Sequence, residues 1–146
     1  MIKVETIGML DIAKINPVLV SESDVANYSF LVDDGDTYLI ANTLVGDDSY
    51  REDVVIKAGE YLNGYLVKAW EGQKLVIDGK HVTGGISSIN VKDELVLDGS
   101  TGKLKKEAPS ANGVYFKVTD KTTLTEAALK VKVCVKTDAA APGVGG

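Results

Sequence analysis

The chain has 146 residues, of which 45% are hydrophobic and 25% are charged; these proportions are typical of one globular domain and not of a disordered segment. Its formal net charge of −5 argues against a nucleic-acid partner, because phosphate binding depends on an excess of lysine and arginine. One cysteine excludes an internal disulfide, and no apolar run reaches the ~20 residues that a membrane helix needs.

The first twenty residues hold two short apolar runs. Pro17 interrupts the second run, and proline suits an edge strand or an extended arm because it lacks a backbone N–H donor. Lys3 and Glu5 lie where a secretory signal would need an apolar core, so we expect synthesis in a cytoplasm. We expect residues 1–20 to form an N-terminal arm or edge strand.

Two hairpins are predicted on either side of the middle of the chain. The first spans residues 28–41 and turns at the acidic stretch 33–37, and the second spans residues 94–105 and turns at 98–102. Before the second hairpin, residues 86–91 form a weak alternating strand.

The stretch 54–82 is the β-rich centre of the chain, because it packs three short apolar runs between glycines. The last run closes on Asp78 and Gly79. Both residue types tolerate the positive φ of a type I′ turn, so a central hairpin is predicted between residues 75–77 and 80–82. The other glycines that punctuate this stretch are Gly59, Gly64 and Gly72.

Towards the C-terminal side, strict alternation predicts strands at 114–118 and 131–136. Residues 122–129 are the only plausible helix, since Thr123 stands three residues before Glu126 in the spacing of a capping box. The return to period two soon afterwards limits such a helix to one or two turns.

The pattern as a whole predicts a mainly β protein. About ten short strands with turn signals roughly every eight to twelve residues are typical of a compact sandwich or a small barrel-like domain, here with at most one short helix. We expect one β domain over residues 21–137 and a flexible C-terminal tail over residues 138–146, which are small and glycine-rich.

His81 is the only histidine and Cys134 the only cysteine, so a multi-histidine metal site cannot be built within one chain. Lys132 and Lys136 share a strand face with Cys134 and could make a thiol reactive, yet no partner base or second cysteine is evident. We interpret His81 as an ordinary strand residue and Cys134 as an incidental thiol. No catalytic, cofactor-binding or metal-binding residue and no cofactor is predicted, and we expect the protein not to be an enzyme.

Acidic residues are concentrated in the window 33–53, where Arg51 is the only base. Dense loop carboxylates could bind calcium, but their spacing differs from that of an EF-hand, so solvated turns are the preferred interpretation. A carboxylate pair for glycoside hydrolysis is disfavoured by an aromatic content of only 6%. The acids are Asp33, Asp34, Asp36, Asp47, Asp48, Glu52 and Asp53.

Lysines are concentrated in a second window, 103–138, where eight of them face four acids. Opposite-sign faces on one small domain would suit a head-to-tail ring of identical subunits, and two plainly solvated surfaces explain the pattern at least as well. The lysines are Lys103, Lys105, Lys106, Lys117, Lys121, Lys130, Lys132 and Lys136.

Residues 56–65, IKAGEYLNGY, and residues 70–81, WEGQKLVIDGKH, resemble the capsid decoration proteins and head-fibre bases of tailed bacteriophages. In those proteins an AGE-x-L-x-G-x-x-V segment often leads into hairpins. The resemblance covers the central third to half of the chain. It implies a β-rich, commonly homotrimeric virion protein that binds the major capsid protein on the outer face of the head and stabilises it without catalysis. Residues 1–20 and the small-residue tail are the two candidate anchors, with no nucleic-acid or membrane partner expected.

An alternative is a non-catalytic host-surface or carbohydrate-binding module, in which Trp70, Tyr61 and Tyr65 would form a stacking platform. Aromatic residues in such positions more often belong to the core. An enzyme is the third possibility, and it is disfavoured because no nucleophile motif is recognisable.

Overall fold

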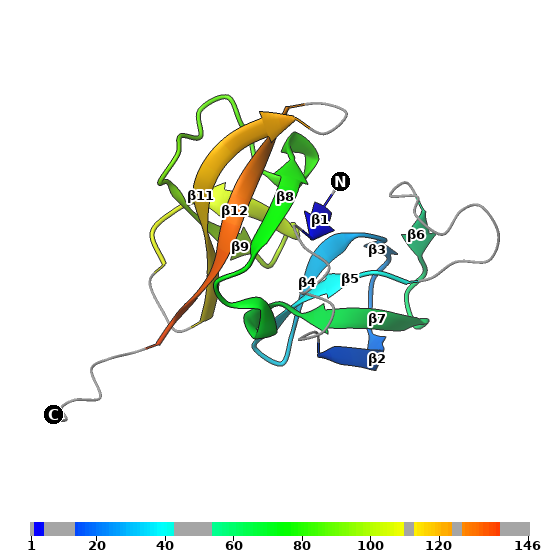
Figure 1. Cartoon of the computed structure of the whole chain (residues 1–146). Helices are drawn as coiled ribbons and strands as arrows, with labels where there is room; N and C mark the ends of the chain where they lie inside the picture. Colours follow the sequence, from blue (N-terminus) through cyan, green and yellow to red (C-terminus); the bar gives the residue numbers. More distant parts are fainter. Residues whose placement is uncertain (1, 5–13, 43–53, 110–112, 124–126, 138–146) are drawn as a thin grey trace, which may run out of the picture.

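The structure, a computed structural model, describes residues 2–4, 14–42, 54–109, 113–123 and 127–137 (Figure 1). These residues form antiparallel sheets joined by turns and short 3-10 helices, which confirms the prediction of a mainly β fold. No sheet within these residues closes into a barrel, so the sandwich-like form is the one that fits.

The larger layer is a six-stranded sheet in which the long β11–β12 hairpin occupies the centre (Figure 1). β12 pairs with β8 on one side and with β11 on the other, so its backbone is hydrogen-bonded along both edges. In sheet order the strands are β1 (Ile2–Val4), β8 (Lys74–Asp78), β12 (Ala127–Lys136), β11 (Gly113–Thr123), β9 (Glu94–Asp98) and β10 (Lys103–Lys106).

The smaller layer is a four-stranded sheet with β2 and β4 at its edges. A separate pair, β3 (Val25–Ala26) with β6 (Val55–Ile56), accompanies it. In sheet order its strands are β2 (Ile15–Val20), β7 (Tyr61–Leu66), β5 (Asp36–Ile40) and β4 (Ser29–Asp33). Pro17 therefore stands in an edge strand, where a missing N–H donor costs least.

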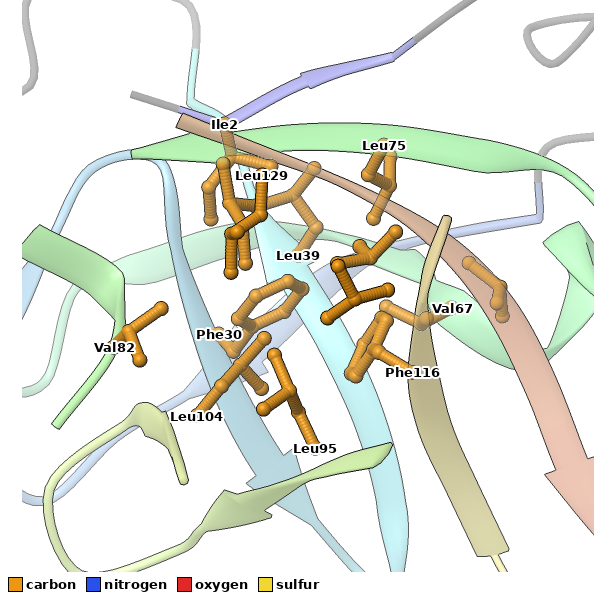
Figure 2. Packing of buried hydrophobic residues seen from close by; sticks show 14 of the residues in the cluster. Ile2, Phe30, Leu39, Val67, Leu75, Val82, Leu95, Leu104, Phe116 and Leu129 are labelled. Atoms are coloured by element: carbon orange, nitrogen blue, oxygen red, sulfur yellow. The ribbon is translucent and has the colours of Figure 1, made fainter. Parts of the chain in front are cut away.

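The main core lies between the two layers (Figure 2). Phe30 of β4 and Phe116 of β11 meet there with ring centroids 5.4 Å apart, and Leu129 of β12 is fully buried beside them. Trp70 ends the 3-10 helix η2 (Val67–Trp70) and stacks on Tyr65 at 5.8 Å. Both layers thus contribute to one apolar cluster, as in a sandwich.

A second, smaller cluster covers the other face of the four-stranded sheet. Side-chain alternation explains it, because Leu39 of β5 points into the main core while its neighbour Ile40 points the opposite way. The β3–β6 pair supplies two of the residues that cover this face. The cluster consists of Leu19, Val25, Ile40, Ile56 and Leu62.

The predicted central hairpin at Asp78 and Gly79 is wrong. β8 ends at Asp78, and residues Gly79–His81 form the 3-10 helix η3. Oδ1 of Asp78 accepts a hydrogen bond from the backbone N–H of Lys80 at 3.1 Å, so the side chain caps a helical turn instead of entering a hairpin turn. Asp78 has φ of −92°, outside the region that a type I′ turn requires.

The type I′ turn is found in the first predicted hairpin, which is confirmed. β4 and β5 pair from Ser29 with Ile40 to Asp33 with Asp36. The two residues between them, Asp34 and Gly35, have φ of 49° and 80°, the positive values that this turn needs. The second predicted hairpin, β9 with β10, is also confirmed.

Two further predictions are wrong. In place of the helix over 122–129, Thr122 and Ala128 are opposite each other in the β11–β12 ladder. A two-turn helix is marginal, whereas strand pairing on both sides of β12 buries Ala128 completely. Residues 86–91 contain no strand and form turns after Gly84 and Gly85, whose φ values are 78° and 79°.

Candidate interaction surfaces

The largest exposed apolar side chains on β2 form a surface that we call the β2 patch. Ile15 is 51% exposed, Val18 is 64% exposed and Val20 is 46% exposed. Tyr61 of β7, at 69% exposure, lies directly opposite Val20 and shares its face of the sheet. Exposed apolar side chains along a sheet edge make this strand a candidate site for binding another molecule.

The local fold of β2 explains why these side chains face solvent. The strand register shifts between Asn16 and Leu19, and Oδ1 of Asn16 accepts a hydrogen bond from the backbone N–H of Val18 at 3.1 Å. This irregularity turns Val18 outward while Leu19 remains buried. Leu19 packs where a Cβ on Gly64 would stand, so Gly64 is a strand glycine required for close approach and not the predicted turn.

The outer face of the six-stranded sheet is rich in lysine. Most of the second charge window lies in β10, β11 and β12, and alternation places Lys117 and Lys132 on the face opposite the core, where both are exposed. Lys74 of β8 joins them from outside the predicted window. The lysine-rich window 103–138 in the sequence could not predict that Lys74, Lys117 and Lys132 lie side by side, because that depends on which residues of neighbouring strands are paired.

Cys134 lies on the same lysine-rich face, directly opposite Tyr115. Its Sγ is 3.7 Å from the carbonyl oxygen of Lys132. Burial and the adjacent Cys134 raise the pKa of Tyr115 above its ordinary value of 10.0. Cys134 is the one cysteine among the described residues, and the interpretation as an incidental thiol stays a prediction.

His81 lies in η3 and not in a strand, where it lines an open groove of about 530 Å³ between the β3–β4 segment and the β9–β10 turn. Two serine hydroxyls along the groove donate hydrogen bonds within the chain. The Ser29 hydroxyl donates to the carbonyl oxygen of Ala26 at 2.7 Å, and Oδ1 of Asp98 accepts from the Ser100 hydroxyl at 2.6 Å.

The acidic window is only partly within the described residues, which include Asp33, Asp34 and Asp36 but not residues 43–53. Asp36 pairs with Lys68 at 3.1 Å. Across the described residues, no three His, Cys, Asp or Glu side chains gather closely enough to hold a metal ion. Asp33 and Asp34 are exposed at the hairpin turn.

The proposed aromatic platform is wrong. Trp70 is only 1% exposed and belongs to the main core, and Tyr65 stacks against it from the same core. Tyr61 alone is open to solvent. A sugar-stacking surface of these three rings therefore does not exist, and Tyr61 belongs to the β2 patch instead.

Hydrogen bonds stabilise the charge of three aspartates at turns. The backbone N–H of Asn90 donates to Asp93 at 2.7 Å and Lys106 lies 3.2 Å away, and together they lower the pKa of the Asp93 carboxyl below 3.8. The Ser100 hydroxyl lowers the pKa of Asp98. A hydrogen bond from the backbone N–H of Ala58 at 3.0 Å lowers that of Asp24.

Comparisons of the chain with protein-family models, with curated proteins and with solved structures find no match. No helix in the described parts of the chain combines the length and apolar character needed to cross a membrane.

Proposed function

We propose that the protein is a structural virion protein that binds the outer face of a tailed-phage head and stabilises it without catalysis. The β2 patch is the observation that carries this proposal. It presents three β-branched side chains and one tyrosine on two neighbouring strands at one edge of the four-stranded sheet. The major capsid protein is the proposed partner, and the virion surface is the proposed location.

The size of the β2 patch favours repeated weak binding. Fully burying a Val or Ile side chain contributes about 1.5–3 kcal/mol, so half-exposed side chains contribute roughly 1 kcal/mol each when a partner covers them. Four such contacts give on the order of 4 kcal/mol before the cost of association is subtracted, so a single site would bind no more tightly than about 1 mM. One subunit would bind weakly, and several linked copies on a repeating lattice would bind tightly.

This arithmetic supports the proposed homotrimer, since three linked β2 patches could engage neighbouring capsomers together. It also supports a stabilising role, because a ligand that binds only the assembled shell shifts the equilibrium towards that shell. The resemblance of residues 56–65 and 70–81 to head decoration proteins points in the same direction. Assembly would take place in the host cytoplasm.

The test is co-sedimentation of the purified chain with empty heads from the phage that encodes it. The double variant Val18→Ser with Val20→Ser should remain folded and lose co-sedimentation by at least roughly tenfold, since two of the four contacts are removed. The matched control is Val32→Ser, because Val32 is 44% exposed on β4, the opposite edge of the same sheet. It should sediment like the wild-type chain.

Two results would overturn the proposal. One is the absence of saturable co-sedimentation by the wild-type chain over the micromolar range. The other is equal loss in the Val32→Ser control, which would mean that apolar surface in general, and not the β2 patch, causes the association.

A further inference from the structure

Three lysines stand in one row across the centre of the six-stranded sheet. Lys74 of β8 is directly opposite Lys132 of β12, and Lys132 is directly opposite Lys117 of β11. The row ends at Glu94 of β9, which is opposite Lys117. We call the three lysines the lysine row.

This arrangement is unfavourable within one chain. Side chains at directly opposite positions are about 5 Å apart at Cβ, and like charges placed there destabilise a sheet. Among the described residues, no carboxylate oxygen lies within 4.0 Å of an ammonium of the lysine row. Lys117 and Lys132 are exposed, so an outside partner can reach them.

The other side chains on this face do not cancel the positive charge of the lysine row. Lys130 and Lys136 flank it on β12, and Tyr115 and Cys134 lie beside it as neutral groups. The described acids near it are Glu94 at the end of the row, Asp120, which is opposite Lys130, and Glu71, whose charge acts on Tyr115. The face is basic even though the whole chain carries a net charge of −5.

A complementary surface is present on the other layer of the molecule. Asp33 lies directly opposite Asp36 in the β4–β5 hairpin, and Asp34 follows in the turn. Lys68 neutralises Asp36, whereas Asp33 and Asp34 are exposed, and no described lysine ammonium lies within 4.0 Å of their carboxylates. The tight two-residue turn holds these two carboxylates on a rigid tip.

We propose that the lysine row binds the acidic β4–β5 turn of a second copy of this chain. Each surface gathers charges of one sign that no ion pair among the described residues neutralises, and the two surfaces have opposite signs. Because the two surfaces differ, the contact is head-to-tail, and such contacts close into rings when the rotation between copies permits. The inference rests on the trimer of the proposed function and names the contact that forms it.

The test exchanges charges between the two surfaces and measures solution mass by light scattering. The row variant is Lys117→Glu with Lys132→Glu, which keeps like charges opposite each other and so leaves the sheet's own repulsion in place. The turn variant is Asp33→Lys with Asp34→Asn, because asparagine tolerates the φ of 49° at position 34. A third variant carries all four changes.

The wild-type chain should be a trimer at low salt, and its mass should fall as salt screens the contact. Each two-residue variant should raise the dissociation concentration by roughly a hundredfold or more, because like charges then meet across the contact. The four-residue variant should recover the trimer. The control Lys14→Glu with Lys121→Glu makes the same change in net charge at exposed positions away from the row and should keep the wild-type mass.

Two outcomes would overturn the inference: a row variant that remains a trimer at low salt, or a folded four-residue variant that fails to recover it. A row variant with wild-type mass that no longer co-sediments with heads would also overturn it, and would assign the lysine row to the capsid contact. A monomeric wild-type chain that still co-sediments would reject the trimer and leave the β2 patch as the capsid site.

Discussion

The two layers of the sandwich differ in how much of their apolar side-chain surface is exposed to solvent. In the six-stranded sheet, Leu129, Val131 and Val133 of the central strand β12 are fully buried on its core face. In the four-stranded sheet, the edge strand β2 leaves three β-branched side chains between 46% and 64% exposed. The central strand of the first layer is packed on its core face, whereas the edge strand of the second leaves apolar surface exposed.

The strongest test of this contrast is Leu129→Ala in the six-stranded sheet. Leu129 is fully buried in the main core, so the change should lower the free energy of unfolding by about 2–5 kcal/mol, as large-to-small core substitutions do. Urea denaturation measures it. Phe30 and Leu39 of the four-stranded sheet belong to the same hydrophobic cluster as Leu129, so both layers should unfold in one transition. Two separate transitions would show that the layers are independent.

A smaller effect is expected for Gly64→Ala in the four-stranded sheet. A Cβ there would overlap Cδ1 of Leu19 and approach Cδ1 of Tyr38 at 3.0 Å, so overpacking should cost about 1–3 kcal/mol. Displacing Leu19 should also move β2 and weaken binding to heads. The control is Gly99→Ala, where a Cβ meets no atom within 4 Å. Equal destabilisation of both variants would contradict the close approach at Gly64.

A substitution on the outer face should stabilise the isolated chain. Lys132→Thr removes the middle charge of the lysine row and should raise the free energy of unfolding by about 0.2–1 kcal/mol at low salt, with less gain at high salt. The measurement belongs at a concentration where the chain is monomeric. Lys121→Thr makes the same change opposite Leu129, where no second lysine stands, and should show no salt-dependent gain.

The smallest effect concerns acid sensitivity. The lowered pKa of Asp93 means that its charged form stabilises the folded state above the ordinary value of 3.8, and that this contribution is lost as pH falls through the lowered folded-state pKa. Asp93→Asn should therefore show a shallower loss of stability between about pH 5 and pH 2 than the wild-type chain. The control is Asp34→Asn, an exposed turn aspartate. Parallel profiles for wild type and Asp93→Asn would reject the assignment.

Local patterns predicted the turns better than they predicted the sheet. Two Asp-Gly pairs look alike in the sequence, yet Asp34 and Gly35 form a hairpin turn while Asp78 caps a 3-10 turn through the N–H of Lys80. Whether the chain folds back as a hairpin depends on which strand is available to pair. β8 pairs with β1 and β12, which are distant from it in the sequence, so it forms no hairpin with the residues that follow it.

The candidate surfaces were predicted less well than the fold, and for the same reason. The window of lysines was visible in the sequence, but the lysine row needs the registers of β8, β12 and β11, which are contacts between distant segments. The β2 patch had a local signal, since Ile15, Val18 and Val20 depart from strict alternation around Pro17. Such a departure is typical of a bulge, which re-aims side chains, but residues 1–20 were predicted only to form an arm or edge strand.

The central position of β12 sets the order in which this protein can fold as it is synthesised. Until residues 127–136 leave the ribosome, β8 has only the short β1 beside it, and the β9–β10 hairpin has no link to β8 through the sheet. The two parts of the large sheet join only when the β11–β12 hairpin enters between them. Since such long-range pairing is slow, the nascent chain should expose its apolar strands until late in translation and depend on chaperones during that interval.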